Sequence, residues 1–166
     1  MATMRKVEFV PFLLTEVTDI FSIRIDGDKM AEINKFLIMF KDTTDPYLKD
    51  DMTKIVTGLS EIANNGALER FFRNEGKMND RVVAIPLYIV PRNHSKHGTL
   101  RLYCIRISDK LLIVGGGGLK TTQTPEEDPI LSSHINTLQS IDNRLKVLGE
   151  DVNLNDSLFN LTVEID

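Results

Sequence analysis

The sequence has little of several features that would place it in a specialised class. A single cysteine, Cys104, occurs in 166 residues, which excludes a disulfide scaffold and a zinc site built from cysteines. No run of 18 apolar residues is present, so we expect no membrane-spanning helix. With a net charge of −4, the chain also lacks the overall basic character that favours binding to nucleic-acid phosphates, although a local basic patch can coexist with an acidic remainder.

What remains is the composition of an ordinary globular domain. Hydrophobic residues make up 42% of the chain and charged residues 27%, both close to the average for soluble proteins. The length suffices for one domain with a sizeable core. We predict a single α+β domain over residues 1–150, followed by an acidic C-terminal extension over residues 151–166. The basic start leads into an apolar stretch that Glu8 interrupts, a pattern that favours a strand over a signal peptide, so the expected location is the cytoplasm.

The N-terminal part predicts strands. Residues 7–14 and 20–25 have strand composition, and Pro11 indicates an edge position or a bulge in the first of them. In the second, alternation of side chains predicts one apolar face.

Two helices are predicted next. Apolar residues recur with a helical period over residues 29–41, with Asp28 as the expected N-cap. A second helix is predicted over residues 46–65, between the cap Asp45 and the stop signal Gly66. Because the link is short, we expect an antiparallel helical hairpin that packs its apolar stripes together and onto the sheet.

Residues 99–114 predict the central hairpin of the sheet. Residues 99–107 and 111–114 are almost continuously apolar and β-prone, and a polar turn at residues 108–110 joins them. Such runs are difficult to place on an exposed edge. Four glycines follow at residues 115–118. Since ten residues and a proline separate them from the next helix, we interpret them as a bulged strand or a close backbone approach, not as a nucleotide-binding loop.

Three further elements complete the predicted fold. Residues 81–90 are a strand candidate interrupted by Pro86, residues 129–148 a final helix capped by Asp128, and residues 161–165 a short strand-like end. The order of strands, two helices, three strands and a helix predicts helices packed on a mostly antiparallel sheet.

The strand ends of the central hairpin carry two short motifs. They read Leu100-Arg101-Leu102-Tyr103 and Lys120-Thr121-Thr122-Gln123-Thr124-Pro125. This region, residues 98–138, resembles the RelE/HigB superfamily of bacterial type II toxins, whose fold has the same element order. The resemblance implies a metal-free endoribonuclease that cleaves messenger RNA on the ribosome, is neutralised by a small antitoxin, and uses no cofactor.

Cleavage of RNA without a metal requires proton transfer at two oxygens and stabilisation of the phosphorane charge. The resemblance implies that Arg101 and Lys120 face the scissile phosphate and that Tyr103 assists positioning or proton transfer, with His94 or His97 nearby. The residues expected to contact RNA are Arg73, Lys77, Arg92, His94, His97 and Gln123. No third ligand is spaced to join the two histidines, so no metal site is predicted.

Ordinary structural roles are the alternative for each of these residues. Arg101 could form a sheet-face ion pair, Tyr103 could be a core aromatic, and Lys120 could be solvated. The second lysine of the toxin family in this region is Thr121 here, which weighs against cleavage more than against the fold. The alternative hypothesis is therefore a non-catalytic binding or structural module on the same fold, and the sequence does not predict the oligomeric state.

Overall fold

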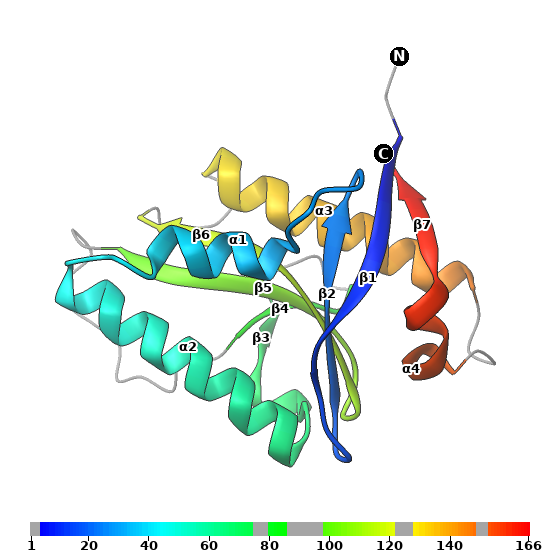
Figure 1. Cartoon of the computed structure of the whole chain (residues 1–166), viewed down its shortest axis with the longest axis horizontal. Coiled ribbons are helices and arrows are strands. Elements are labelled where there is room, and N and C mark those ends of the chain that lie inside the picture. The colour runs from blue at the N-terminus through cyan, green and yellow to red at the C-terminus, as the bar shows by residue number, and fades with distance from the viewer. Residues whose placement is uncertain (1–3, 75–79, 86–97, 122–127, 149–152) are drawn as a thin grey trace.

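The chain folds around one mixed sheet whose two faces are covered by helices (Figure 1). A computed structural model describes residues 4–74, 80–85, 98–121, 128–148 and 153–166. Within these residues seven strands form the sheet, in the order β3-β4-β5-β6-β2-β1-β7. The strands are β1 (Arg5–Leu14), β2 (Asp19–Ile25), β3 (Arg73–Asn74), β4 (Val82–Ala84), β5 (Thr99–Ser108), β6 (Leu111–Lys120) and β7 (Thr162–Ile165). The helices are α1 (Glu32–Phe40), α2 (Pro46–Asn65), α3 (Pro129–Val147) and α4 (Leu154–Ser157), with 3₁₀ turns η1 (Glu69–Phe71) and η4 (Leu158–Asn160).

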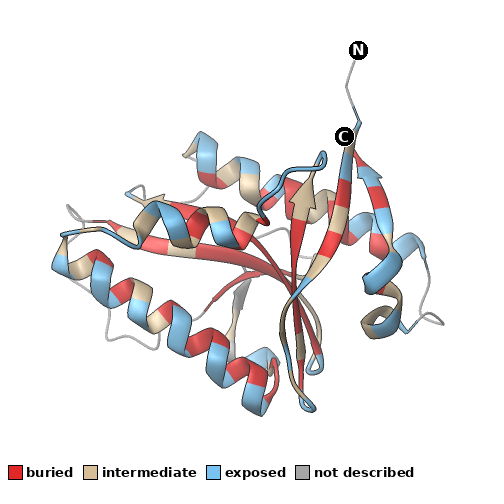
Figure 2. Ribbon diagram, viewed as in Figure 1, coloured by how far each residue is buried: buried red, intermediate tan, exposed pale blue. Residues whose placement is uncertain are grey.

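Each face of the sheet has its own apolar core. On one face, α1 and α2 bury Phe36 and Leu59 against strand residues such as Leu102. On the other, α3 and the C-terminal segment bury Leu138 and Val163. The buried residues of the long helices form stripes turned toward the sheet (Figure 2). Both helices of the predicted pair thus lie on one face, and the central strands are buried on both sides.

The predicted hairpin of β5 and β6 lies in the middle of the sheet and is antiparallel, as expected. The α+β class and the mostly antiparallel sheet are confirmed. One parallel pair was not predicted: residues 19–22 of β2 pair with residues 111–114 of β6. At its end, the Ser22 hydroxyl donates to the Val114 carbonyl oxygen at 2.8 Å and accepts from the Ile33 N–H at 3.3 Å. Ser22 therefore marks the end of the pairing between β2 and β6, beyond which α1 packs beside β6.

The glycine run continues β6 to Lys120, so the strand extends well beyond the predicted end at residue 114. The register with β5 shifts between Leu102 and Cys104. A Cβ on Gly117 would lie 1.9 Å from the Arg101 carbonyl oxygen, a contact that no side chain tolerates. The interpretation of these glycines as a bulged strand with close backbone approach is confirmed.

Helix N-termini follow the predicted capping chemistry in two of three cases, and α2 ends at the predicted stop, Gly66. Asp45 accepts a hydrogen bond from the Tyr47 N–H at 2.8 Å, and Asp128 accepts from Ile130 at 2.9 Å. The predicted start of α1 is wrong, because the helix begins at Glu32 after an extended Ala31. Asp28 forms an ion pair with Lys35 instead of capping the helix.

The C-terminal segment adds a strand to the sheet. The strand-like composition of residues 161–165 is confirmed by β7, which pairs antiparallel with β1 at the sheet edge. Val163 and Ile165 are buried on the α3 face. The strand predicted over residues 81–90 is observed as β4, and residues 86–90 lie outside the described residues. None of the helices in the described ranges is long and apolar enough to cross a membrane.

Candidate functional site

The three predicted catalytic residues lie along one face of the β5–β6 hairpin. Leu100 and Leu102 face the α1–α2 core, so strand alternation places Arg101 on the opposite face, which α3 covers. Lys120 follows Leu119, which packs on the α1–α2 side, and thus shares the face of Arg101. Arg101 pairs with Gly118 and Thr99 pairs with Lys120, so the two cationic residues are diagonal neighbours across the hairpin.

Arg101 has a guanidinium atom that the described residues leave unsatisfied. Its Nε is buried from solvent and has no hydrogen-bond partner among them. The residue opposite is Gly118, so no side chain covers the backbone there except Leu131 of α3, 3.3 Å from where a Cβ would be. A buried donor without a partner is costly, and an anion bound at this end of the hairpin would satisfy it.

Tyr103 and Cys104 belong to the interior of the domain. Tyr103 is fully buried in the core beneath α3, so its side chain has no exposed surface with which to contact RNA. Burial raises the pKa of the Cys104 thiol well above its ordinary range, and its Sγ donates to the Val83 carbonyl oxygen at 3.6 Å. Cys104 is therefore the small buried hydrophobe typical of strand cysteines.

None of the six predicted RNA-contacting residues has a side chain that the structure describes. Arg73 is in β3, but its side chain is not described. The remaining five residues lie outside the described residues, and they are Lys77, Arg92, His94, His97 and Gln123.

His134 is a candidate that the sequence reasoning missed. Its imidazole lies directly over Gly116, where a Cβ would approach Cε1 to 2.5 Å. Burial lowers the pKa of His134, and the nearby charges of Glu32 and Lys35 have smaller, opposing effects. Burial therefore favours the neutral form of the imidazole. The available signal was its spacing, three residues after Leu131 and hence on the helix face that carries the apolar stripe, where His134 is half-buried.

A second cluster of charges lies at the turn end of the same hairpin. The Arg81 Nε donates to Asp142 Oδ1 at 2.7 Å, and its backbone N–H donates to Oδ2 at 3.0 Å. The Arg106 Nε donates to the Ala67 carbonyl oxygen at 2.7 Å, and its Nη2 pairs with Asp109. A cavity of about 170 Å³ beside them is lined by Glu69, Phe72, Asp80, Arg81, Val83 and Arg106. Asp142, fully buried on α3, is signalled in the sequence only by its place beside Ile141 on the apolar stripe.

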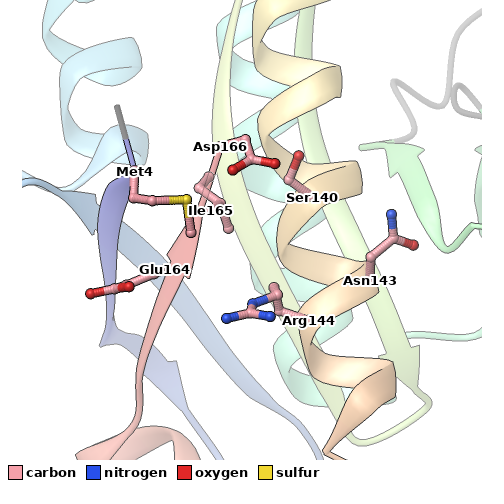
Figure 3. Close-up of a pocket in the computed structure, with 7 residues that line it drawn as sticks. All are labelled: Met4, Ser140, Asn143, Arg144, Glu164, Ile165 and Asp166. Atoms are coloured by element: carbon pink, nitrogen blue, oxygen red, sulfur yellow. The ribbon is translucent and has the colours of Figure 1, made fainter. Parts of the chain in front are cut away.

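Another cavity, of about 180 Å³, lies between α3 and the edge strand β7 (Figure 3). Its lining residues are Met4, Ser140, Asn143, Arg144, Glu164, Ile165 and Asp166. Figure 3 shows the Arg144 side chain directed toward β7 and the Ser140 side chain close to Asp166. Asn143, Arg144, Glu164 and Asp166 are exposed, so these polar walls give a ligand little shelter from water.

In the described part of the chain no three histidine, cysteine or acidic side chains gather as a metal site. No protein-family model, curated protein or solved structure matches the chain.

Proposed function

We propose that the protein is an endoribonuclease of the RelE/HigB type, which cleaves messenger RNA on the ribosome without a metal and is neutralised by a small antitoxin. The observation that carries the proposal is the buried Arg101 Nε without a described partner, diagonal to Lys120. The two motifs and the order of strands, helix pair, strands and helix also support it.

In this proposal the scissile phosphate binds at the outer end of the hairpin. Its oxygens accept from Arg101 and Lys120, which stabilise the charge of the phosphorane. Tyr103 packs in the core beneath α3 and so supports the strand that carries Arg101, and it does not contact RNA. Proton transfer falls to His94 or His97, or to His134, whose imidazole lies against Gly116 of the same strand.

The second candidate function is a non-catalytic binding module. Two features favour it: Tyr103 is completely buried, and Thr121 stands where the toxin family has a second lysine. The two candidates differ in one outcome, which is whether the protein alone stops growth.

Induced expression in a bacterial host tests both. We expect growth arrest by the wild type, together with cleavage of messenger RNA in a translation extract. Loss of a charge that stabilises an oxyanion lowers rates by about 10²–10³, so Arg101→Ala and Lys120→Ala should abolish both effects with unchanged circular dichroism. Lys49→Ala, an exposed lysine on α2, is the matched control and should remain toxic. Full toxicity of the double variant would rule out this site, and no toxicity of the wild type would favour the binding module.

A further inference from the structure

The cavity at the turn end of the hairpin is distinct from the proposed catalytic end. Arg106 lies five residues along β5 from Arg101, a separation of about 17 Å in a strand. The cavity lies where β4, β5 and η1 meet, and its lining includes both arginines of the turn-end cluster. What it binds is therefore independent of the proposal for RNA cleavage.

Both guanidinium groups at this cavity are held in place by the protein. The Nε and Nη2 atoms of Arg81 bind one oxygen of the buried Asp142 at 2.7 Å. Arg106 uses its Nε for the Ala67 carbonyl oxygen and its Nη2 for Asp109. Each arginine keeps an Nη1 group for which the described residues supply no partner. Groups fixed in this way bind a ligand with little loss of side-chain entropy.

The charge around the cavity disfavours a phosphate. Asp142 and Asp109 already compensate the two arginines, and the cavity wall adds the carboxylates of Glu69 and Asp80. An anion would therefore meet at least as much negative as positive charge. A neutral ligand that both accepts from arginine and donates to a carboxylate fits this environment.

The flat and apolar parts of the wall narrow the ligand further. Phe72 and Val83 also line the cavity, and aromatic side chains stack on nucleobases. Glu69 is exposed, and its only bond to a described residue is made by its backbone carbonyl oxygen, which accepts from the Phe72 N–H. Its carboxylate, which lines the cavity, can therefore accept from a ligand. Asp80 is already engaged by the Val82 N–H and by Gln139.

We propose that this cavity binds a guanine base, either of a free nucleotide or of an RNA strand. Guanine presents O6 and N7 as acceptors, which match arginine, and N1–H and N2–H₂ as donors, which match a carboxylate. Adenine presents a donor where guanine has O6, so it would place an N–H against the guanidinium groups.

Titration of the full chain with nucleoside monophosphates, followed by calorimetry or saturation-transfer NMR, tests the assignment. We expect GMP to bind about tenfold more tightly than IMP, which lacks the 2-amino group, and about a hundredfold more tightly than AMP. Glu69→Gln should weaken GMP by about tenfold, whereas Glu61→Gln, an exposed acid on α2, should leave it unchanged. Phe72→Leu should also weaken GMP, since it removes the stacking surface.

Equal binding of GMP and AMP, absence of binding of every purine at millimolar concentration, or an equal effect of the two glutamate variants would overturn the proposal. Short RNAs with one guanine or one adenine identify the source of the base. Tighter binding of the guanine RNA than of GMP indicates an RNA strand, and equal binding indicates a free nucleotide. Neither result depends on growth arrest, so failure here is distinguishable from failure of the proposed nuclease.

Discussion

The two ends of the β5–β6 hairpin use arginine in opposite ways. At the turn end, Arg106 binds the Asp109 carboxylate and the Ala67 carbonyl oxygen, and its neighbour Arg81 binds both oxygens of the buried Asp142 carboxylate. At the glycine end, the Arg101 Nε is buried without a partner in the described residues. The arginines at the turn end therefore stabilise the folded structure. The buried, unsatisfied Nε of Arg101 is better explained by a role in binding a ligand than by a role in stability.

The largest expected effect concerns Asp142 at the turn end. Asp142→Ala leaves Arg81 without its carboxylate and also removes the ion pair of Asp142 with Lys146 at 3.3 Å. Loss of one member of a buried ion pair costs about 3–5 kcal/mol, which urea denaturation would measure. The exposed pair of Lys54 with Asp50 is the control, and Asp50→Ala should cost less than about 1 kcal/mol. Similar losses of unfolding free energy for the two variants would contradict the conclusion that the charged groups at the turn end stabilise the fold.

Substitutions of two neighbouring glycines test the strand register at the glycine end of the hairpin. A Cβ on Gly117 would meet the Arg101 backbone, whereas on Gly118 it would meet only the tip of Leu131 at 3.3 Å. Since backbone cannot yield as a side chain does, Gly117→Ala should lower the free energy of unfolding by about 3 kcal/mol. Gly118→Ala should cost about 1 kcal/mol or less. Thermal or urea unfolding of both variants decides the matter, and the reverse ranking would contradict the strand register described above.

A direct comparison exchanges each arginine for methionine. Arg106→Met loses a hydrogen bond to the Ala67 carbonyl oxygen and an ion pair with Asp109, and should cost about 1–2 kcal/mol. Arg101→Met removes a buried Nε that has no described partner, so stability should stay unchanged or rise slightly. If Arg101→Met destabilises as much as Arg106→Met, Arg101 has a structural role and the contrast between the two ends fails.

The smallest effect is a pH dependence from His134. Its pKa is lowered in the folded state by burial, so the unfolded chain binds the proton more readily. Stability should therefore be intact above the ordinary pKa of about 6.5 and fall as the pH decreases through it toward the lowered value. Urea midpoints measured from pH 7.5 to pH 5 should show the fall, and His134→Gln should reduce its slope. An unchanged slope would mean that other groups cause it.

Local signals in the sequence predicted most of the individual elements. The caps Asp45 and Asp128, the helical periods and the polar turn of the hairpin act within a few residues, so they are readable without tertiary contacts. The parallel pairing of β2 with β6 and the docking of β7 on β1 join distant segments. No local pattern specifies such partners, and these features were missed for that reason.

The candidate site was likewise predictable only as far as local patterns reach. Alternation along β5 placed Arg101 and Tyr103 on one face, but it could not show that α3 covers Tyr103 completely. His134 and Asp142 were missed because polar residues on a helix are usually solvated. Their places on the buried stripe of α3 gain meaning only once the helix packs against Gly116 and Arg81.

The parallel pairing of β2 with β6, which ends at Ser22, has a consequence for the kinetics of folding. The β1–β2 and β5–β6 hairpins each join neighbouring segments, so they can form early from local contacts. The β2–β6 pairing brings Ser22 to Val114, which is 92 positions away in the chain. It therefore closes a loop that contains both α1 and α2. Closure of so long a loop carries an entropic cost before its contacts are gained. We therefore expect the two hairpins to assemble first and the union of β2 with β6 to limit the rate at which the domain folds.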